Sequence, residues 1–154
     1  MKKLISAIAV AALIFALAAC GGGYTSVDAE ALSASLGSSD IFVDELVLLS
    51  EKNTENNTGV DPALCDKMEF YMGSGATGEE YGIFTCKTEA DAKTVLSSLE
   101  AHKTWLYDTY STYNTEALPR IENATIVRAG KYVVFVSAND YNKAEAIVNA
   151  ALVK

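Results

Sequence analysis

Histidine and cysteine are scarce in this chain of 154 residues, which contains one histidine and three cysteines. A histidine-dependent hydrolase needs its base beside a recognisable nucleophile, but no GxSxG motif accompanies His102, the single histidine. The HExxH and CxxC spacings of zinc sites are absent as well. We therefore expect no catalytic residue, no metal ligand and no cofactor, and we expect His102 to lie at the surface or at the boundary of the core.

Positive charge is also in short supply, because 12 Lys and Arg residues stand against 20 Asp and Glu residues. Two of the twelve, Lys2 and Lys3, lie in an apolar leader, so the rest of the chain is still more acidic. Affinity for nucleic acids is built from clustered Lys and Arg. This charge balance argues against a nucleic-acid partner.

The only long apolar run covers residues 4–16, which is too short for a membrane span of about 20 residues. Together with the preceding lysines it is typical of a secretory signal. The sequence Leu-Ala-Ala-Cys at residues 17–20 resembles the lipobox of bacterial lipoproteins, which implies cleavage before Cys20 and a diacylglyceryl group on its sulfur. The alternative is an uncleaved core or signal-anchor helix in which Cys20 is an ordinary small residue.

These signals divide the chain into a signal peptide (residues 1–19), a lipidated Cys20 with a glycine-rich tether (residues 20–26) and one globular domain (residues 27–154). Two acyl chains suffice for stable anchoring, whereas an acidic surface is repelled by anionic headgroups. We therefore expect the lipid on Cys20 to hold the protein at the extracellular face of the cell membrane.

Hydrophobic periodicity predicts two hairpins, each followed by a helix. Alternation at residues 66–72 and 80–84 indicates the first hairpin, and a capping signal at Thr88 begins an amphipathic helix. A second round runs from residue 124 to residue 152. We expect a two-layer α+β fold, in which a four-stranded antiparallel sheet carries its helices on one face. The two rounds form either a hairpin-helix pseudo-repeat or a coincidence of common motifs.

The flanking segments are less regular. Ser26 is positioned to cap a short helix that ends at Gly37. Residues 39–50 fit helical spacing, whereas residues 46–49 would equally suit a short buried strand; we favour the helix. Residues 51–61 are polar and rich in Asn and Thr, which indicates a surface loop.

The loop of the first hairpin, Gly-Ser-Gly-Ala-Thr-Gly at residues 73–78, has the GxGxxG pattern of dinucleotide sites. That pattern binds a pyrophosphate only where it opens a helix. Here Glu79 and Glu80 follow within a strand pattern, and two carboxylates would repel phosphate. We interpret residues 73–78 as a flexible hairpin loop.

Once Cys20 is acylated, Cys65 and Cys86 are the only thiols left in a secreted domain, and such a pair is a disulfide candidate. A hairpin centred on residues 73–78 places Phe70 opposite Tyr81 and Cys65 opposite Cys86. This register predicts a disulfide across the hairpin. The alternative is a pair of reduced, partly buried thiols, because a slip of one residue would turn one sulfur to the other face.

An aromatic cluster lies towards the end of the first long helix. Exposed rings there would stack on sugars or anchor a protein interface, although aromatic residues at helical spacing are more often core. The candidate binding residues are Trp105, Tyr107, Tyr110 and Tyr113.

The most specific likeness to known proteins lies in residues 75–84, 113–116, 121–124 and 130–133. Together these segments resemble a family of Gram-positive surface lipoproteins that carries a domain of unknown function. The resemblance extends over roughly residues 28–153 and implies an uncharacterised extracellular lipoprotein. It brings no catalytic residues.

The expected function is therefore a non-enzymatic binding or interaction module whose partner is an envelope protein or a glycan. The alternative is a small cell-envelope hydrolase, because a pair of carboxylates needs to meet only in space and leaves no sequence motif. A structural envelope protein without a specific ligand is a third reading of the same features.

Overall fold

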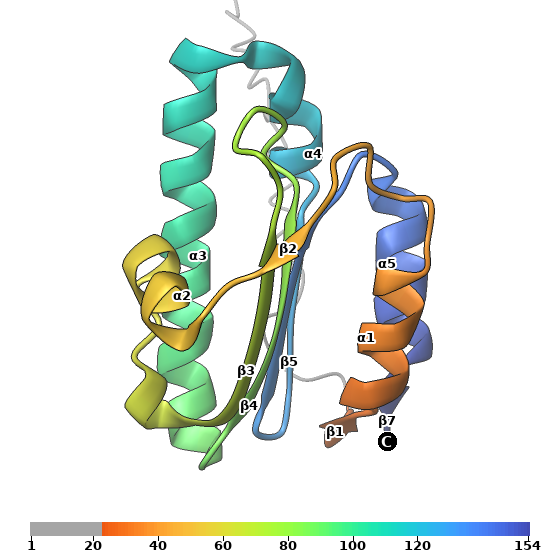
Figure 1. The fold of residues 1–154 in the computed structure, drawn as a ribbon. Coiled ribbons are helices and arrows are strands. Elements are labelled where there is room, and N and C mark those ends of the chain that lie inside the picture. The colour runs from red at the N-terminus through yellow and green to blue at the C-terminus, as the bar shows by residue number, and fades with distance from the viewer. Residues whose placement is uncertain (1–22) are drawn as a thin grey trace, which may run out of the picture.

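The computed structural model describes residues 23–154, so Cys20 and the leader lie outside the described residues. An open antiparallel sheet forms its centre, with strand order β2-β3-β4-β6-β5 (Figure 1). The strands are β2 (Val47–Leu48), β3 (Cys65–Met72), β4 (Glu80–Cys86), β5 (Thr125–Ala129) and β6 (Tyr132–Ser137). The α+β class is confirmed, but the main sheet has five strands instead of the four expected.

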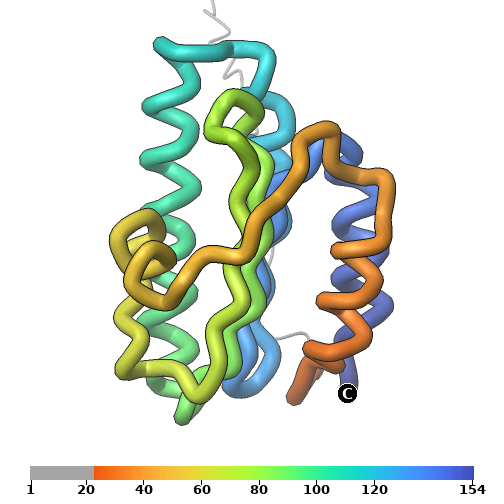
Figure 2. The backbone as a smooth tube through the Cα atoms, viewed as in Figure 1, coloured from red at the N-terminus to blue at the C-terminus, as the bar shows by residue number. Residues whose placement is uncertain are grey.

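Helices cover both faces of this sheet, as Figures 1 and 2 show. The helices are α1 (Ala29–Gly37), α2 (Glu51–Thr58), α3 (Glu89–Tyr113), α4 (Leu118–Glu122) and α5 (Tyr141–Ala150). The layer of α2 and α3 lies on one face, and the layer of α1 and α5 lies on the other. The expectation of helices on a single face is therefore wrong.

Within residues 23–154, no helix combines the length and the apolar character needed to cross a membrane.

The central strands explain this three-layer arrangement, because almost every residue of β4 and β6 is buried. Successive side chains of a strand point to opposite faces. Phe84 and Phe135 therefore pack beneath α3, whereas Ile83 and Val134 pack beneath α1 and α5. A strand with apolar residues at both odd and even positions needs a packed layer on each face of the sheet.

The same arrangement decides between a pseudo-repeat and a coincidence of common motifs. The two hairpins are joined through the antiparallel pair β4 and β6, and α3 and α5 follow them on opposite faces of the sheet. A two-fold axis through the sheet would leave both helices on one face. The similarity between the two hairpin-helix units is therefore local.

The register of the first hairpin differs from the expected one by a single residue. Phe70 lies opposite Gly82, not Tyr81, because the turn is centred on Ala76: a hydrogen bond from Gly73 N–H to the Glu79 carbonyl (3.0 Å) pairs these two residues across it. Cys65 nevertheless lies opposite Cys86, because the register shifts between Cys65 and the second residue after it. The predicted position of Cys65 opposite Cys86 is confirmed, and the predicted Phe70–Tyr81 pairing is wrong.

Helix caps decide the remaining differences. Thr88 accepts a hydrogen bond from Asp91 N–H and caps α3, as predicted. Ser26, however, lies in the short strand β1 (Ser26–Val27), which pairs with β7 (Leu152–Val153), and Asp28 caps α1 in its place.

Residues 39–50 do not form the favoured helix. They run as an extended segment that ends in β2, an exposed edge strand. The expected loop at residues 51–61 instead contains α2, which Ser50 caps by accepting a hydrogen bond from Asn53 N–H (3.3 Å) and which ends at Gly59 in the left-handed region. Caps define this helix, because its polar sequence has no apolar stripe.

Candidate functional site

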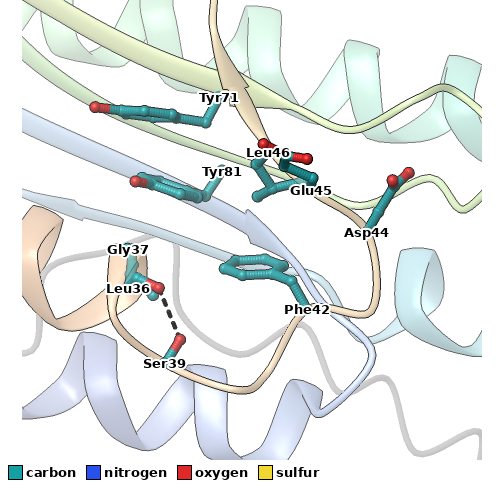
Figure 3. A pocket seen from close by; sticks show the side chains of 9 residues that line it. All are labelled: Leu36, Gly37, Ser39, Phe42, Asp44, Glu45, Leu46, Tyr71 and Tyr81. Carbon is teal, nitrogen blue, oxygen red and sulfur yellow. Dashed lines mark hydrogen bonds between the residues drawn. The ribbon is translucent and has the colours of Figure 1, made fainter.

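A cavity of about 310 Å³ opens between the sheet and the segment that joins α1 to β2, and we call it the aromatic cavity (Figure 3). Its lining comes from four separate parts of the chain. The lining residues are Leu36, Gly37, Ser39, Phe42, Asp44, Glu45, Leu46, Tyr71 and Tyr81. None of these was predicted as a site residue, because no local motif joins them.

Three stacked rings form one wall of the cavity (Figure 3). Tyr71 and Tyr81 are cross-strand neighbours whose ring centroids lie 4.6 Å apart at 17°. Phe42 stacks against Tyr81 at 5.7 Å and 22°. Burial, and the neighbouring Tyr71, raise the pKa of Tyr81 to about 12, so its phenol stays neutral. The wall is flat, apolar and edged by hydroxyl groups.

The buried carboxylate of Glu79 fixes the segment that carries Phe42. It accepts hydrogen bonds from the N–H groups of Val43 (2.9 Å), Asp44 (2.8 Å) and Asn139 (2.9 Å). The Arg120 guanidinium lies 3.6 Å away. One side chain just before β4 thus positions a segment some 35 residues earlier in the chain.

Asp44 connects the aromatic cavity to the loop of residues 73–78. Its Oδ2 accepts hydrogen bonds from Ser74 N–H (2.8 Å), Ser74 Oγ (2.7 Å) and Thr77 Oγ1 (3.1 Å). The hydrogen bonds from Ser74, with a smaller one from Thr77, hold the pKa of Asp44 below its usual range. Strand β4 follows this loop, and no helix does, so the interpretation of residues 73–78 as a hairpin loop is confirmed.

The fixed charges of the cavity are all negative. Asp44 and Glu45 contribute carboxylates, and no Lys or Arg belongs to its lining. Lys143, on α5, is bound to Asp40, which lies outside the lining. The cavity therefore offers hydrogen-bond acceptors and aromatic surface to a ligand that carries donors or positive charge.

The predicted aromatic surface does not form one platform. Tyr110 is buried, with 5% of its surface exposed, and its hydroxyl donates to the Gly75 carbonyl (2.6 Å), so its assignment to a binding surface is wrong. Trp105, Tyr107 and Tyr113 are exposed. Residues two positions apart in an α-helix are separated by about 200° around its axis, which places Trp105 and Tyr107 on opposite flanks of α3.

Trp105 instead borders an open groove of about 630 Å³ between α2 and α3, which we call the lateral groove. His102 lies beneath the groove and is buried, whereas we expected it at the surface or at the boundary of the core. Its Nε2 contacts the carboxylate of Glu80, and each of these side chains is only 2% exposed. The helical spacing indicates this buried position, because His102 follows the buried Leu99 by three residues and so lies on the same face of α3.

Cys65 and Cys86 are buried, free thiols in the structure. The neighbouring Cys86, and burial, raise the pKa of Cys65. A protonated thiol is a poor nucleophile, so Cys65 is not arranged for thiolate chemistry.

Comparison with known protein families identifies a domain in this chain. The family model described as a domain of unknown function (DUF4358) matches residues 45–138, from just before β2 to just after β6. The matched segment contains Glu45, Tyr71, Glu79 and Tyr81, whereas Phe42 and Asp44 lie just before it. No curated protein and no solved structure matches the chain.

Proposed function

The chain belongs to the family of this domain of unknown function, DUF4358, and we propose that it is a lipid-anchored binding module that holds a small organic cation in the aromatic cavity. The observation that carries the proposal is the lining of the cavity. Stacked aromatic rings and two carboxylates lie together there, with no basic residue among them.

The two parts of the lining suit two parts of one ligand. Alkyl or aryl groups are buried favourably against aromatic rings, and an ammonium group is attracted both to their π faces and to carboxylates. Asp44 stays ionised because Ser74 donates two hydrogen bonds to it. A volume of about 310 Å³ is at the small end of the range for ligand pockets, which favours a small molecule.

Binding fits the carboxylates better than hydrolysis does. A carboxylate-pair hydrolase needs one protonated acid with a raised pKa. Asp44 has a lowered pKa, and Glu45 is exposed to water. Glu79 and Glu80 do not form a pair either, because adjacent residues point to opposite faces and each has its own partner.

The proposed anchor is the lipid on Cys20, at the extracellular face of the cell membrane. Thr25 N–H already bonds to the Val153 carbonyl (2.9 Å), so the folded part begins within the expected tether. Four residues separate Cys20 from Thr25, and the five steps from one to the other span at most about 17 Å. A tether of this length holds the domain close to the bilayer.

Titration calorimetry on the lipidated protein in detergent tests the ligand class directly. Three probes of similar size are compared: benzyltrimethylammonium, benzyl alcohol and benzoate. We expect saturable binding of the cation alone, weakened by added salt because the attraction is electrostatic. Binding of benzoate, or equal binding of the cation and the alcohol, would contradict the proposal.

A further inference from the structure

We propose that the lateral groove between α2 and α3 is a second ligand site, which takes a neutral saccharide on the face of Trp105. This site lies on the opposite face of the sheet from the aromatic cavity. It is therefore independent of the cation-binding function proposed above.

Trp105 is a preformed stacking platform. Its side chain is 56% exposed, and it stacks on the His102 ring at a centroid distance of 5.9 Å and 18°. The contact between His102 and Glu80 fixes the lower ring, which in turn supports the indole. One face of the indole is thus covered and the other faces solvent, where an apolar sugar face can lie against it.

The remaining lining selects for uncharged, hydroxyl-rich ligands. Asn56 and Asn57 border the groove from α2, and Ser98 borders it from α3. Amide and hydroxyl groups both donate and accept hydrogen bonds, as sugar hydroxyls do. No Asp, Glu, Lys or Arg belongs to the lining, so a charged ligand would find no counter-charge.

A second, independent observation points to a ligand at the floor of the groove. His102 Nδ1 is buried and has no hydrogen-bond partner among residues 23–154. Nε2 faces the Glu80 carboxylate, so Nδ1 is the ring nitrogen left without a partner. Buried polar atoms are nearly always satisfied. Sugar hydroxyls both donate and accept hydrogen bonds, so a saccharide carries the kind of group that this nitrogen lacks.

Fluorescence isolates this site, because Trp105 is the only tryptophan of the chain. The full lipidated protein in detergent is titrated with N-acetylglucosamine trimer as the neutral saccharide probe. We expect a saturable change in Trp emission, and at least tenfold weaker binding in Asn56→Ala. Saturating benzyltrimethylammonium, which is expected in the other cavity, leaves the sugar titration unchanged.

Calorimetry extends the test to variants without the indole. Trp105→Ala is expected to abolish sugar binding and Trp105→Phe to retain part of it, since a ring remains. Tyr107→Ala, on the opposite flank of α3, is the matched control and keeps wild-type binding; melting curves verify that each variant is folded. No saturable signal with the trimer, or an equal loss in Tyr107→Ala and Trp105→Ala, would overturn the proposal.

Discussion

Cys65 and Cys86 lie directly opposite each other on β3 and β4, and a register shift of one residue brings them together. The pairs from Lys67 to Met72 follow one constant register, in which Asp66 would oppose Cys86. The bulge at this end of β3 moves Cys65 into that place and leaves Asp66 exposed. Bulges commonly re-aim a side chain in this way.

We predict that this pair forms a disulfide in the oxidising cell envelope. The bond would close a loop of about 20 residues and add about 3 kcal/mol to the free energy of unfolding on the chain-entropy model. Thiol labelling and mass spectrometry of protein isolated from envelopes measure it. Two free thiols in the absence of reductant would show that the pair stays reduced.

Cys20→Ala is expected to abolish palmitate labelling and to release the domain from the membrane fraction or stall its processing. The reason is that, in the proposed anchor, the acyl chains on Cys20 supply the membrane affinity, whereas an acidic surface is repelled by anionic headgroups. Cys65→Ala serves as the control and should label like the wild type. A Cys20→Ala protein that still labels and fractionates with membranes would refute lipidation at this residue.

Glu79→Gln is expected to lower the free energy of unfolding by about 2 kcal/mol, because hydrogen bonds to a charged acceptor contribute about 1.5 to 3 kcal/mol. Amide exchange at Val43, Asp44 and Asn139 should accelerate, since these N–H groups donate to the carboxylate. Urea unfolding and hydrogen exchange measure both effects. Glu100→Gln, on the exposed side of α3, should leave both unchanged, and equal behaviour of the two variants would contradict the positioning role of Glu79.

Tyr81 should make stability decline at alkaline pH. Its pKa is raised to about 12 by burial and by Tyr71, against about 10 in the unfolded chain, so the folded state binds the proton more tightly. Its contribution is fully present below about pH 10 and is lost as the pH rises towards 12. Unfolding free energies from pH 8 to 12 should fall less steeply in Tyr81→Phe than in exposed Tyr113→Phe; identical slopes would refute this.

The elements with strong local signals were predictable. The Thr88 cap and the apolar stripe of α3 define that helix within one segment, and both hairpins have apolar strands around glycine-containing turns. Burial of both sheet faces was also written in the sequence, because Ile83 and Phe84 are adjacent large apolar residues in one strand. The alternation over residues 80–84 predicts one buried face only, so it does not predict the second helical layer.

The functional site was not predictable, because it is assembled from distant segments. Phe42 stacks against Tyr81 where the Glu79 carboxylate holds the backbone at Val43. The side chain of Glu79 follows a glycine-rich loop and looks exposed in the sequence, yet it is almost fully buried. The exposed aromatic residues of α3 could be recognised, but helical geometry separates Trp105 from Tyr107.

The most direct test of the account is calorimetric titration of benzyltrimethylammonium into the wild type, Glu45→Gln and Glu100→Gln. Glu45 lines the aromatic cavity and Glu100 lies on exposed α3 surface, so the two variants remove the same charge from different places. We predict that Glu45→Gln weakens binding by about fivefold, the effect of losing one partly solvated ion pair. Glu100→Gln should bind like the wild type. Absence of saturable binding to the wild type, or equal weakening in both variants, would contradict a cation site in the aromatic cavity.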